Sequence, residues 1–304
     1  MKHIFSFFNK QKQFEEDVLS GKIEYSSYYK DSFRRFKKNK SAMFCLVVII
    51  LLILIAIFAP LISPYNPDAQ DYASILAQPS AKHLLGADEY GRDILSRILY
   101  GTRVSLSIGI FAQLLASLIG ITLGSIAGYS GGAVDAVISR IMEIFSAFPD
   151  MLFAMAIMTF MGKGVQNLFI ALGLLTWVRT ARMIRGSVIQ LKEKEYVQAS
   201  IAAGANSFWI ITKALIPNCL STIIVLITLG IPNAIMYEAS LSFLGLGIQP
   251  PTPSWGNMIS SAQSFIGFLP IYSIMPGVAI MITVIAMNIF GDGLRDALDP
   301  KLRT

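Results

Sequence analysis

One carboxylate stands inside an apolar stretch of the sequence. Asp150 follows Pro149 within a run of mostly apolar residues that is long enough to cross a membrane. A carboxyl group at that depth is costly unless it faces water or a partner, so such residues mark proton relays and solute paths. We therefore take Pro149 and Asp150 as candidate pathway residues. The alternative is a satisfied carboxyl group packed against the bend that the proline causes.

Signatures of catalysis and of cofactor binding are absent from the sequence. It contains no G-x-x-x-x-G-K-[ST] phosphate loop, no H-E-x-x-H and no G-x-S-x-G. The acidic residues between 68 and 93 lack the spacing of a cation-binding loop, which favours a solvated loop over a metal site. Cys45 and Cys219 lie in or beside apolar runs and predict neither a disulfide nor a metal ligand. The sequence predicts a non-catalytic chain that binds no cofactor or metal itself.

The composition is that of a membrane protein. Hydrophobic residues make up 54% of the chain and charged residues 14%, and the charged share is about half that of an ordinary soluble domain. The net charge of +6 comes from Lys and Arg at the ends of apolar runs, where they orient membrane helices. We therefore expect an all-α, polytopic protein in contact with lipid, and no nucleic-acid partner.

Six apolar runs are predicted to cross the membrane. A helix needs about 20 apolar residues to do so, and the runs cover residues 42–62, 104–128, 137–161, 166–185, 214–237 and 271–290. Basic residues from Arg34 to Lys40 place the N-terminus in the cytoplasm, and Arg295, Lys301 and Arg303 place the C-terminus on the same side. Residues 1–41 form a cytoplasmic segment, whose aromatic residues either lie on the lipid surface or belong to a solvated tail.

The outside segments and one glycine row carry further predictions. Residues 63–102 lie outside and become helical from Asp93, which is placed to pair with Arg97. Residues 238–270 are rich in Gly and Pro and predict an irregular, partly re-entrant loop with Trp255 near the interface. Steps of four leave one helical face bare for close packing at Gly120, Gly124 and Gly128. The alternative for these glycines is a row that faces lipid.

A charged stretch from Arg179 to Pro217 separates two apolar runs. Its first three arginines, at steps of three, are explained by snorkelling to lipid phosphate. A cytoplasmic loop at about 186–213 follows, in which a run of small residues leads to Gly204, a suitable helix stop. Asn206 or Ser207 then caps a second short helix, which Pro217 closes. The stretch predicts a helix, a sharp bend and a helix, on which an external partner docks.

This loop resembles the "EAA" loop of bacterial ABC importer permeases, whose pattern is Glu-Ala-Ala, a Gly and a late Leu-Pro. Here Gln198-Ala199-Ser200, Gly204 and Ile216-Pro217 take those places, with Gln198 for the Glu and Ser200 for the second Ala. Four further stretches are similar to the peptide and nickel branch of these permeases: HLLGAD at 83–88 with GRD at 91–93 and Ser96-Arg97, AFP at 147–149, SFLGLG at 242–247 with PPTPSWG at 250–256, and GDGLRD at 291–296 with LDP at 298–300. The basic N-terminal cluster and the long first outside loop indicate the "C"-type permease of oligopeptide or dipeptide importers.

The resemblance implies a type I ABC importer permease fold in the bacterial cytoplasmic membrane and a role in peptide uptake. It implies a homologous second permease subunit, two cytoplasmic ATPase subunits that bind ATP and Mg, and an extracytoplasmic substrate-binding protein. The loop then lays a coupling helix into a groove of the ATPase, with contacts at Glu195, Tyr196, Gln198, Ala199, Ser200, Gly204 and Ala205. A larger side chain at Gly204 is expected to clash or to unbend the loop.

Two other functions remain open at this stage. A nickel or metallophore importer shares the fold and differs only in cargo. A proton-coupled carrier would instead use Asp150, with few other ionisable residues near the middle of the membrane to support it.

Overall fold

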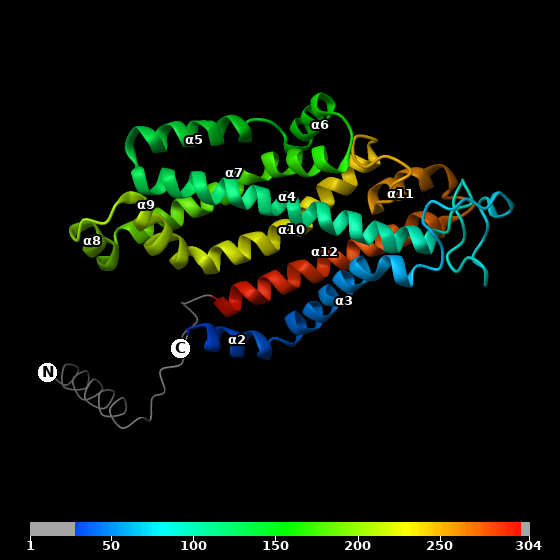
Figure 1. The fold of residues 1–304 in the computed structure, drawn as a ribbon, viewed down its shortest axis with the longest axis horizontal. Coiled ribbons are helices and arrows are strands. Elements are labelled where there is room, and N and C mark those ends of the chain that lie inside the picture. Colours follow the sequence, from blue (N-terminus) through cyan, green and yellow to red (C-terminus); the bar gives the residue numbers. More distant parts are fainter. Residues whose placement is uncertain (1–27, 299–304) are drawn as a thin grey trace, which may run out of the picture.

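The computed structural model describes residues 28–298, in which every regular element is a helix. The aromatic residues of 1–27, together with Lys301 and Arg303, entered the predicted topology but lie outside this range. The helices are α2 (Tyr28–Lys38), α3 (Lys40–Ile62), α4 (Ile94–Ser130), α5 (Gly132–Ser146), α6 (Asp150–Met161), α7 (Val165–Lys192), α8 (Glu195–Ala202), α9 (Ser207–Trp209), α10 (Leu220–Phe243), α11 (Trp255–Ala262) and α12 (Pro270–Leu298) (Figure 1).

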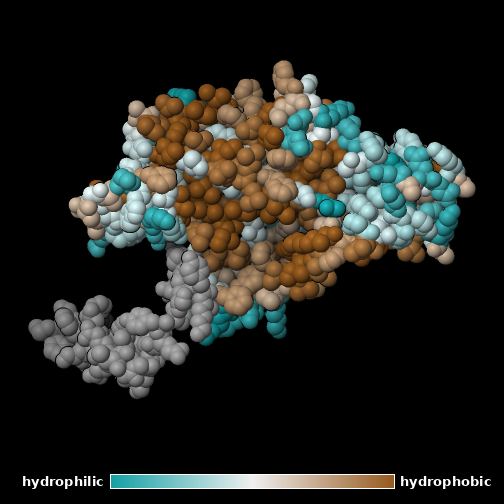
Figure 2. Space-filling model, viewed as in Figure 1, coloured by the Kyte–Doolittle hydropathy of each residue, from teal (hydrophilic) through white to brown (hydrophobic). Residues whose placement is uncertain are grey.

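A broad apolar band separates two hydrophilic ends of the molecule (Figure 2). Four helices in the described range are long and apolar enough to span a membrane: α3, α4, the continuous helix Ser207–Phe243, and α12. The α5–α6 pair makes a fifth if it counts as one span. Length and hydropathy therefore give four or five spans rather than the six predicted. The predicted fourth run lies in α7, whose arginines lower its hydropathy although it packs along α4.

The predicted third run is not one kinked helix. It divides into α5 and α6, which meet at an angle of 90°. Pro149 has an extended backbone, with φ −59° and ψ 126°, and stands directly before α6. Proline has no N–H to donate and disfavours helical geometry in the residue before it, which here is Phe148. Asp150 consequently lies in the first turn of α6 rather than inside a continuous helix.

The glycine row on α4 lies against α7. A Cβ atom added at Gly124 would come within 2.5 Å of the carbonyl oxygen of Ala181, and one at Gly128 within 2.8 Å of that of Arg185. At Gly120 the nearest atom is Cβ of Thr180, at 2.6 Å. These distances are shorter than van der Waals contact, so the two helices approach at backbone distance because the side chains are absent.

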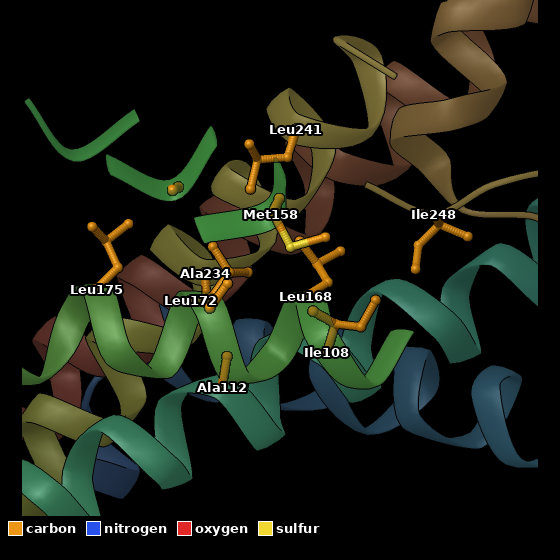
Figure 3. Close-up of a cluster of buried hydrophobic side chains, with 11 residues drawn as sticks. Ile108, Ala112, Met158, Leu168, Leu172, Leu175, Ala234, Leu241 and Ile248 are labelled. Atoms are coloured by element: carbon orange, nitrogen blue, oxygen red, sulfur yellow. The ribbon is translucent and has the colours of Figure 1, made fainter. Parts of the chain in front are cut away.

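Side chains from four helices form the apolar core beside this contact (Figure 3). Leu168 and Leu172 of α7 meet Ile108 of α4, Met158 of α6 and Leu241 of α10, and all are almost fully buried. This cluster fixes α6 on the bundle even though the chain breaks before it.

The segment before α4, residues 63–93, is a folded cap and not a solvated loop. Asp88 and Asp93 are buried, and Asp88 accepts a hydrogen bond from Nε of Arg92 at 2.7 Å. The predicted Asp93–Arg97 pair does not form, because Asp93 caps α4 by accepting from the backbone N–H of Ser96 at 2.8 Å. Arg97 instead donates to the carbonyl of Pro67 at 2.9 Å.

The segment predicted as an irregular loop contains α11 and the end of α10. Trp255 is fully buried instead of lying at an interface. Its neighbour Glu238 is also fully buried and accepts hydrogen bonds from the hydroxyls of Ser105 at 3.0 Å and Ser242 at 2.8 Å. The Ser105 hydroxyl in turn accepts from the backbone N–H of Trp255 at 3.4 Å. One carboxyl group therefore joins α4, α10 and α11.

We expect Glu238→Leu to lower the free energy of unfolding by about 1–3 kcal/mol, because two buried hydroxyls lose their acceptor. Glu238→Gln keeps the shape and one acceptor and should cost less. Thermal unfolding of the purified protein in detergent measures both. Ser240→Ala is the matched control, since the Ser240 hydroxyl only returns to Met236 of its own helix. Equal melting temperatures for Glu238→Leu and Ser240→Ala would contradict the role assigned to this network.

Candidate functional site

The cytoplasmic loop of the prediction folds into a tight corner between α8 and α9, which we call the coupling corner (residues 195–209). The backbone N–H of Ala205 donates to the carbonyl of Ser200 at 3.1 Å, and that of Gly204 to Ile201 at 2.9 Å. This pair of bonds is the Schellman motif, which needs a left-handed residue, and Gly204 has φ +82°. Asn206 then caps α9 by accepting from the N–H of Trp209 at 2.8 Å. The predicted bend and cap are both present.

Two buried side chains anchor the coupling corner on the bundle. Val197 of α8 and Ile210, just after α9, are buried in a cluster with Ile184 and Val188 of α7. Gln198 adds a polar tie, because its Nε2 donates to the carbonyl of Lys192 at the end of α7, at 2.9 Å. The glutamine in place of the family's glutamate thus has a structural partner within the chain.

The predicted contact residues of the corner face outward. Five are exposed and two, Ser200 and Ala205, are half-buried. Large apolar side chains are exposed in the corner, at Tyr196 among the contact residues and at Ile201, Phe208 and Trp209 beside them. Partial burial raises the pKa of the Tyr196 hydroxyl above its ordinary value, and a tyrosine is neutral at physiological pH even without this shift. The corner presents a partly apolar surface, with Glu195 as its one charged side chain, at a hydrophilic end of the molecule.

Two expectations for the corner are corrected. An added Cβ at Gly204 meets no atom within 4 Å, so a clash inside this chain does not occur; unbending of the loop stays a prediction, because the position has a positive φ. Pro217 does not close the second helix, which runs on from Ser207 to Phe243. The chain widens to a π-helix over Ile210–Leu215 and tightens to a 3-10 helix over Ile216–Cys219. This change of hydrogen-bond register lets the helix continue past Pro217, which has no N–H to donate to the preceding turn.

A cavity of about 570 Å³ opens between α5, α7 and α10. Its wall includes the pathway candidate Asp150, whose Oδ2 accepts a hydrogen bond from the hydroxyl of Tyr237 at 2.7 Å. Gln113, Asn233 and Arg179 contribute further polar groups to the wall. Pro149 holds the break that places Asp150 here but does not itself line the cavity.

The three arginines of α7 have different surroundings, and the lipid explanation does not hold for all of them. Arg185 donates two hydrogen bonds to Asp135 of α5, the longer at 2.6 Å. Arg182 lines the cavity and donates to the hydroxyl of Ser146 at 2.7 Å. Arg179 lines the cavity too, and within residues 28–298 it makes no hydrogen bond or ion pair.

The contacts between the polar residues of the cavity were beyond the reach of sequence patterns. Tyr237 ends an apolar run, and no spacing relates it to Asp150, which lies 87 residues away. Gln113 has its amide held by Ser117 and the carbonyl of Leu226, and it fits because Gly230 has no side chain: an added Cβ there would lie 2.1 Å from the amide. The glycine in the facing run is the one signal that could have indicated this close approach.

Comparison with known proteins adds an independent observation. The model of the binding-protein-dependent transport system inner membrane component family matches residues 120–304. The model of the N-terminal transmembrane domain of oligopeptide transport permease C matches residues 27–79. Together they cover the coupling corner and the residues of the cavity wall except Gln113.

Curated relatives match over nearly their whole length. A dipeptide transport system permease protein of Alkalihalophilus pseudofirmus is 45% identical over 91% of this chain and 91% of its own. An oligopeptide transport system permease protein of Bacillus subtilis is 43% identical, with 91% of each chain covered. A glutathione transport system permease protein of Pectobacterium atrosepticum is 42% identical over 91% of this chain and 92% of its own.

The fold has a solved counterpart. A chain from the inward-facing MetNI methionine ABC transporter superposes with a TM-score of 0.57 at 19% identity, covering 68% of this chain and 98% of that one. At that identity the likeness concerns the fold alone, and it supports the helical permease architecture.

Proposed function

The chain belongs to the family of binding-protein-dependent transport system inner membrane components, and we propose that its cargo is peptides. It is a multi-pass inner membrane permease subunit of an ABC importer. Relatives that align along almost the entire chain are named for dipeptides, oligopeptides and glutathione. All of these are peptides, which is the observation that carries the proposal for cargo.

We further propose that the coupling corner is the docking element for one of two cytoplasmic ATPase subunits. The exposed apolar side chains of the corner support this, because such a group at a hydrophilic surface is typical of a protein interface. The backbone bonds within the corner hold its shape before any partner arrives. Docking on a preformed shape loses little conformational freedom.

The same proposal gives the orientation of the chain in the membrane. The coupling corner lies on the cytoplasmic side, together with the basic residues of α2, and the cap of residues 63–93 lies on the opposite side. Both termini are then cytoplasmic. A substrate-binding protein delivers peptide at the cap, and a homologous second permease subunit completes the pathway. ATP and Mg bind to the ATPase subunits and not to this chain.

Reconstitution tests the proposal. The chain is co-purified with its co-encoded permease, ATPases and binding protein, placed in proteoliposomes, and supplied with a labelled tripeptide and ATP. We expect uptake that requires both ATP and the binding protein. Uptake of nickel or a metallophore complex with no uptake of peptide would overturn the proposal that peptides are the cargo. Uptake that follows an imposed proton gradient without ATP, and is lost in Asp150→Asn, would support the carrier alternative.

A further inference from the structure

The cavity beside α7 carries charges of both signs that the chain leaves largely unpaired. Among the cavity's arginines, Arg182 is bound to Ser146, whereas Arg179 has all five N–H donors free of partners within residues 28–298. In the same cavity wall, Asp150 accepts one hydrogen bond at Oδ2, and its Oδ1 has no partner in the same range. Both side chains are solvent-exposed in the isolated chain.

An unpaired guanidinium and an unpaired carboxylate cannot face hydrocarbon at low cost. The wall that bears them therefore borders water, the second permease subunit, or a charged solute. The amide groups of the wall are compatible with a solute that has a peptide backbone. Asn233 donates to the carbonyl of Leu229 at 3.1 Å, and its own amide oxygen has no partner within the described helices. That oxygen is placed to accept from a passing N–H.

We propose that this cavity is a transient binding site for the charged ends of a peptide, with Arg179 receiving the α-carboxylate and Asp150 the α-ammonium group. The proposal rests on peptide import and assigns the group recognised within that function. A guanidinium binds a carboxylate through two parallel hydrogen bonds, which an amide cannot reproduce. A carboxylate binds an ammonium group and discriminates against an acetylated amine, which is neutral.

The site is suited to weak, transient binding of a permeating peptide and not to tight binding. The cavity is open, and Asp150 already shares its charge with the Tyr237 hydroxyl. A permeation site must be favourable enough to enter and weak enough to leave. A small peptide offers both charged ends to one cavity, whereas a longer peptide presents them in turn.

Substrates blocked at one end test the proposal without any mutation. The complete transporter is reconstituted, and uptake is compared for Ala-Phe-Ala, its C-terminal amide and its N-acetyl form. Each peptide is used at a concentration that saturates the binding protein, as measured separately by calorimetry. We expect turnover of the free peptide to exceed that of each blocked form by about tenfold, the worth of one charge-assisted pair. Equal turnover of the three would overturn the proposal while leaving peptide import intact.

Variants of Arg179 and Asp150 test which end of the peptide each side chain binds. In Arg179→Gln, turnover of the free peptide should fall to that of the C-terminal amide, and in Asp150→Asn it should fall to that of the N-acetyl form. Arg179→Lys, which keeps the charge, should retain part of the preference. Arg140→Gln is the matched control, because Arg140 pairs with Glu143 on the exposed face of α5 and does not line the cavity.

The outcomes separate the proposal from its premise. An Arg179→Gln transporter that slows all three peptides equally would mean that Arg179 supports the second subunit, and the site would be wrong. An unchanged preference would also overturn it. If the variant fails to assemble, the comparison of blocked peptides on the wild-type transporter still decides. A wild-type transporter that takes up none of the peptides at the expense of ATP would contradict the proposed function itself.

Discussion

Gly204→Glu is expected to reduce peptide uptake by about tenfold or more while the protein still inserts and ATP hydrolysis continues. Any residue with a Cβ atom costs about 1–2 kcal/mol in the left-handed conformation that this position requires, and about 1.4 kcal/mol corresponds to tenfold. The substitution also adds a second carboxylate to a docking surface that already carries Glu195. Because an added Cβ meets no atom within 4 Å, folding of the chain itself should survive. Parallel measurement of uptake and ATP hydrolysis in proteoliposomes detects this uncoupling.

Two controls separate the corner from general backbone strain. Gly162 has φ +81° after α6, and the nearest atom to an added Cβ is Nδ2 of Asn167, at 4.0 Å. Gly162→Glu therefore introduces the same strain away from the coupling corner and should leave coupling intact. Gly204→Asn keeps a positive φ at lower cost and adds no charge, so its uptake should lie between that of wild type and Gly204→Glu. Uptake at the wild-type rate in Gly204→Glu would contradict the proposal that the corner is the docking element.

Gly124→Leu should prevent α4 and α7 from packing, with loss of folded protein from the membrane. Its Cβ would come within 2.5 Å of a backbone oxygen of Ala181, and a backbone cannot move aside as a side chain can. Overpacking costs about 1–3 kcal/mol where side chains yield, so a contact with backbone should reach at least the upper end. Fluorescence-detected size exclusion and thermal unfolding measure the yield and the stability. Gly124→Ala should show the same defect in milder form.

A glycine in the facing helix supplies the control for Gly124. Gly186 lies in α7, and an added Cβ there meets nothing within 4 Å. Gly186→Ala should be neutral or should raise stability by up to about 1 kcal/mol, because alanine is the better helix former. Similar yields and melting temperatures for Gly124→Leu and the wild type would show that the helices do not need this close approach.

Patterns within one segment predicted local structure well. The small residues around Gly204 and the capping residue Asn206 indicated the coupling corner, because Schellman and Asn caps depend on residues only a few positions apart. The apolar runs located α3, α10 and α12 for a similar reason. The proline at 149 predicted a bend but not its size, since whether a helix kinks or breaks depends on what the two halves pack against.

Contacts between distant segments were not predictable from spacing. Asp93 was expected to bind Arg97 one turn away, but it caps the helix, and Arg97 reaches Pro67 of the folded cap. The partners of Asp150 and Arg185 come from other helices, so no periodicity in one run could identify them. A glycine row predicts that another helix packs closely against it, but only the fold identifies that helix as α7.

The helix that begins at the coupling corner and ends beside the outer cap has a mechanical consequence. It runs through 37 residues without interruption, a length of about 55 Å at 1.5 Å per residue. Pro217 does not end it, because the change of register keeps the segment helical, and Pro232 lies within the same helix. The proposed docking corner therefore stands at one end of a single helical element, with the cavity wall along its middle and Glu238 near the other end. We expect a displacement applied at the corner to reach the cavity wall through this one element.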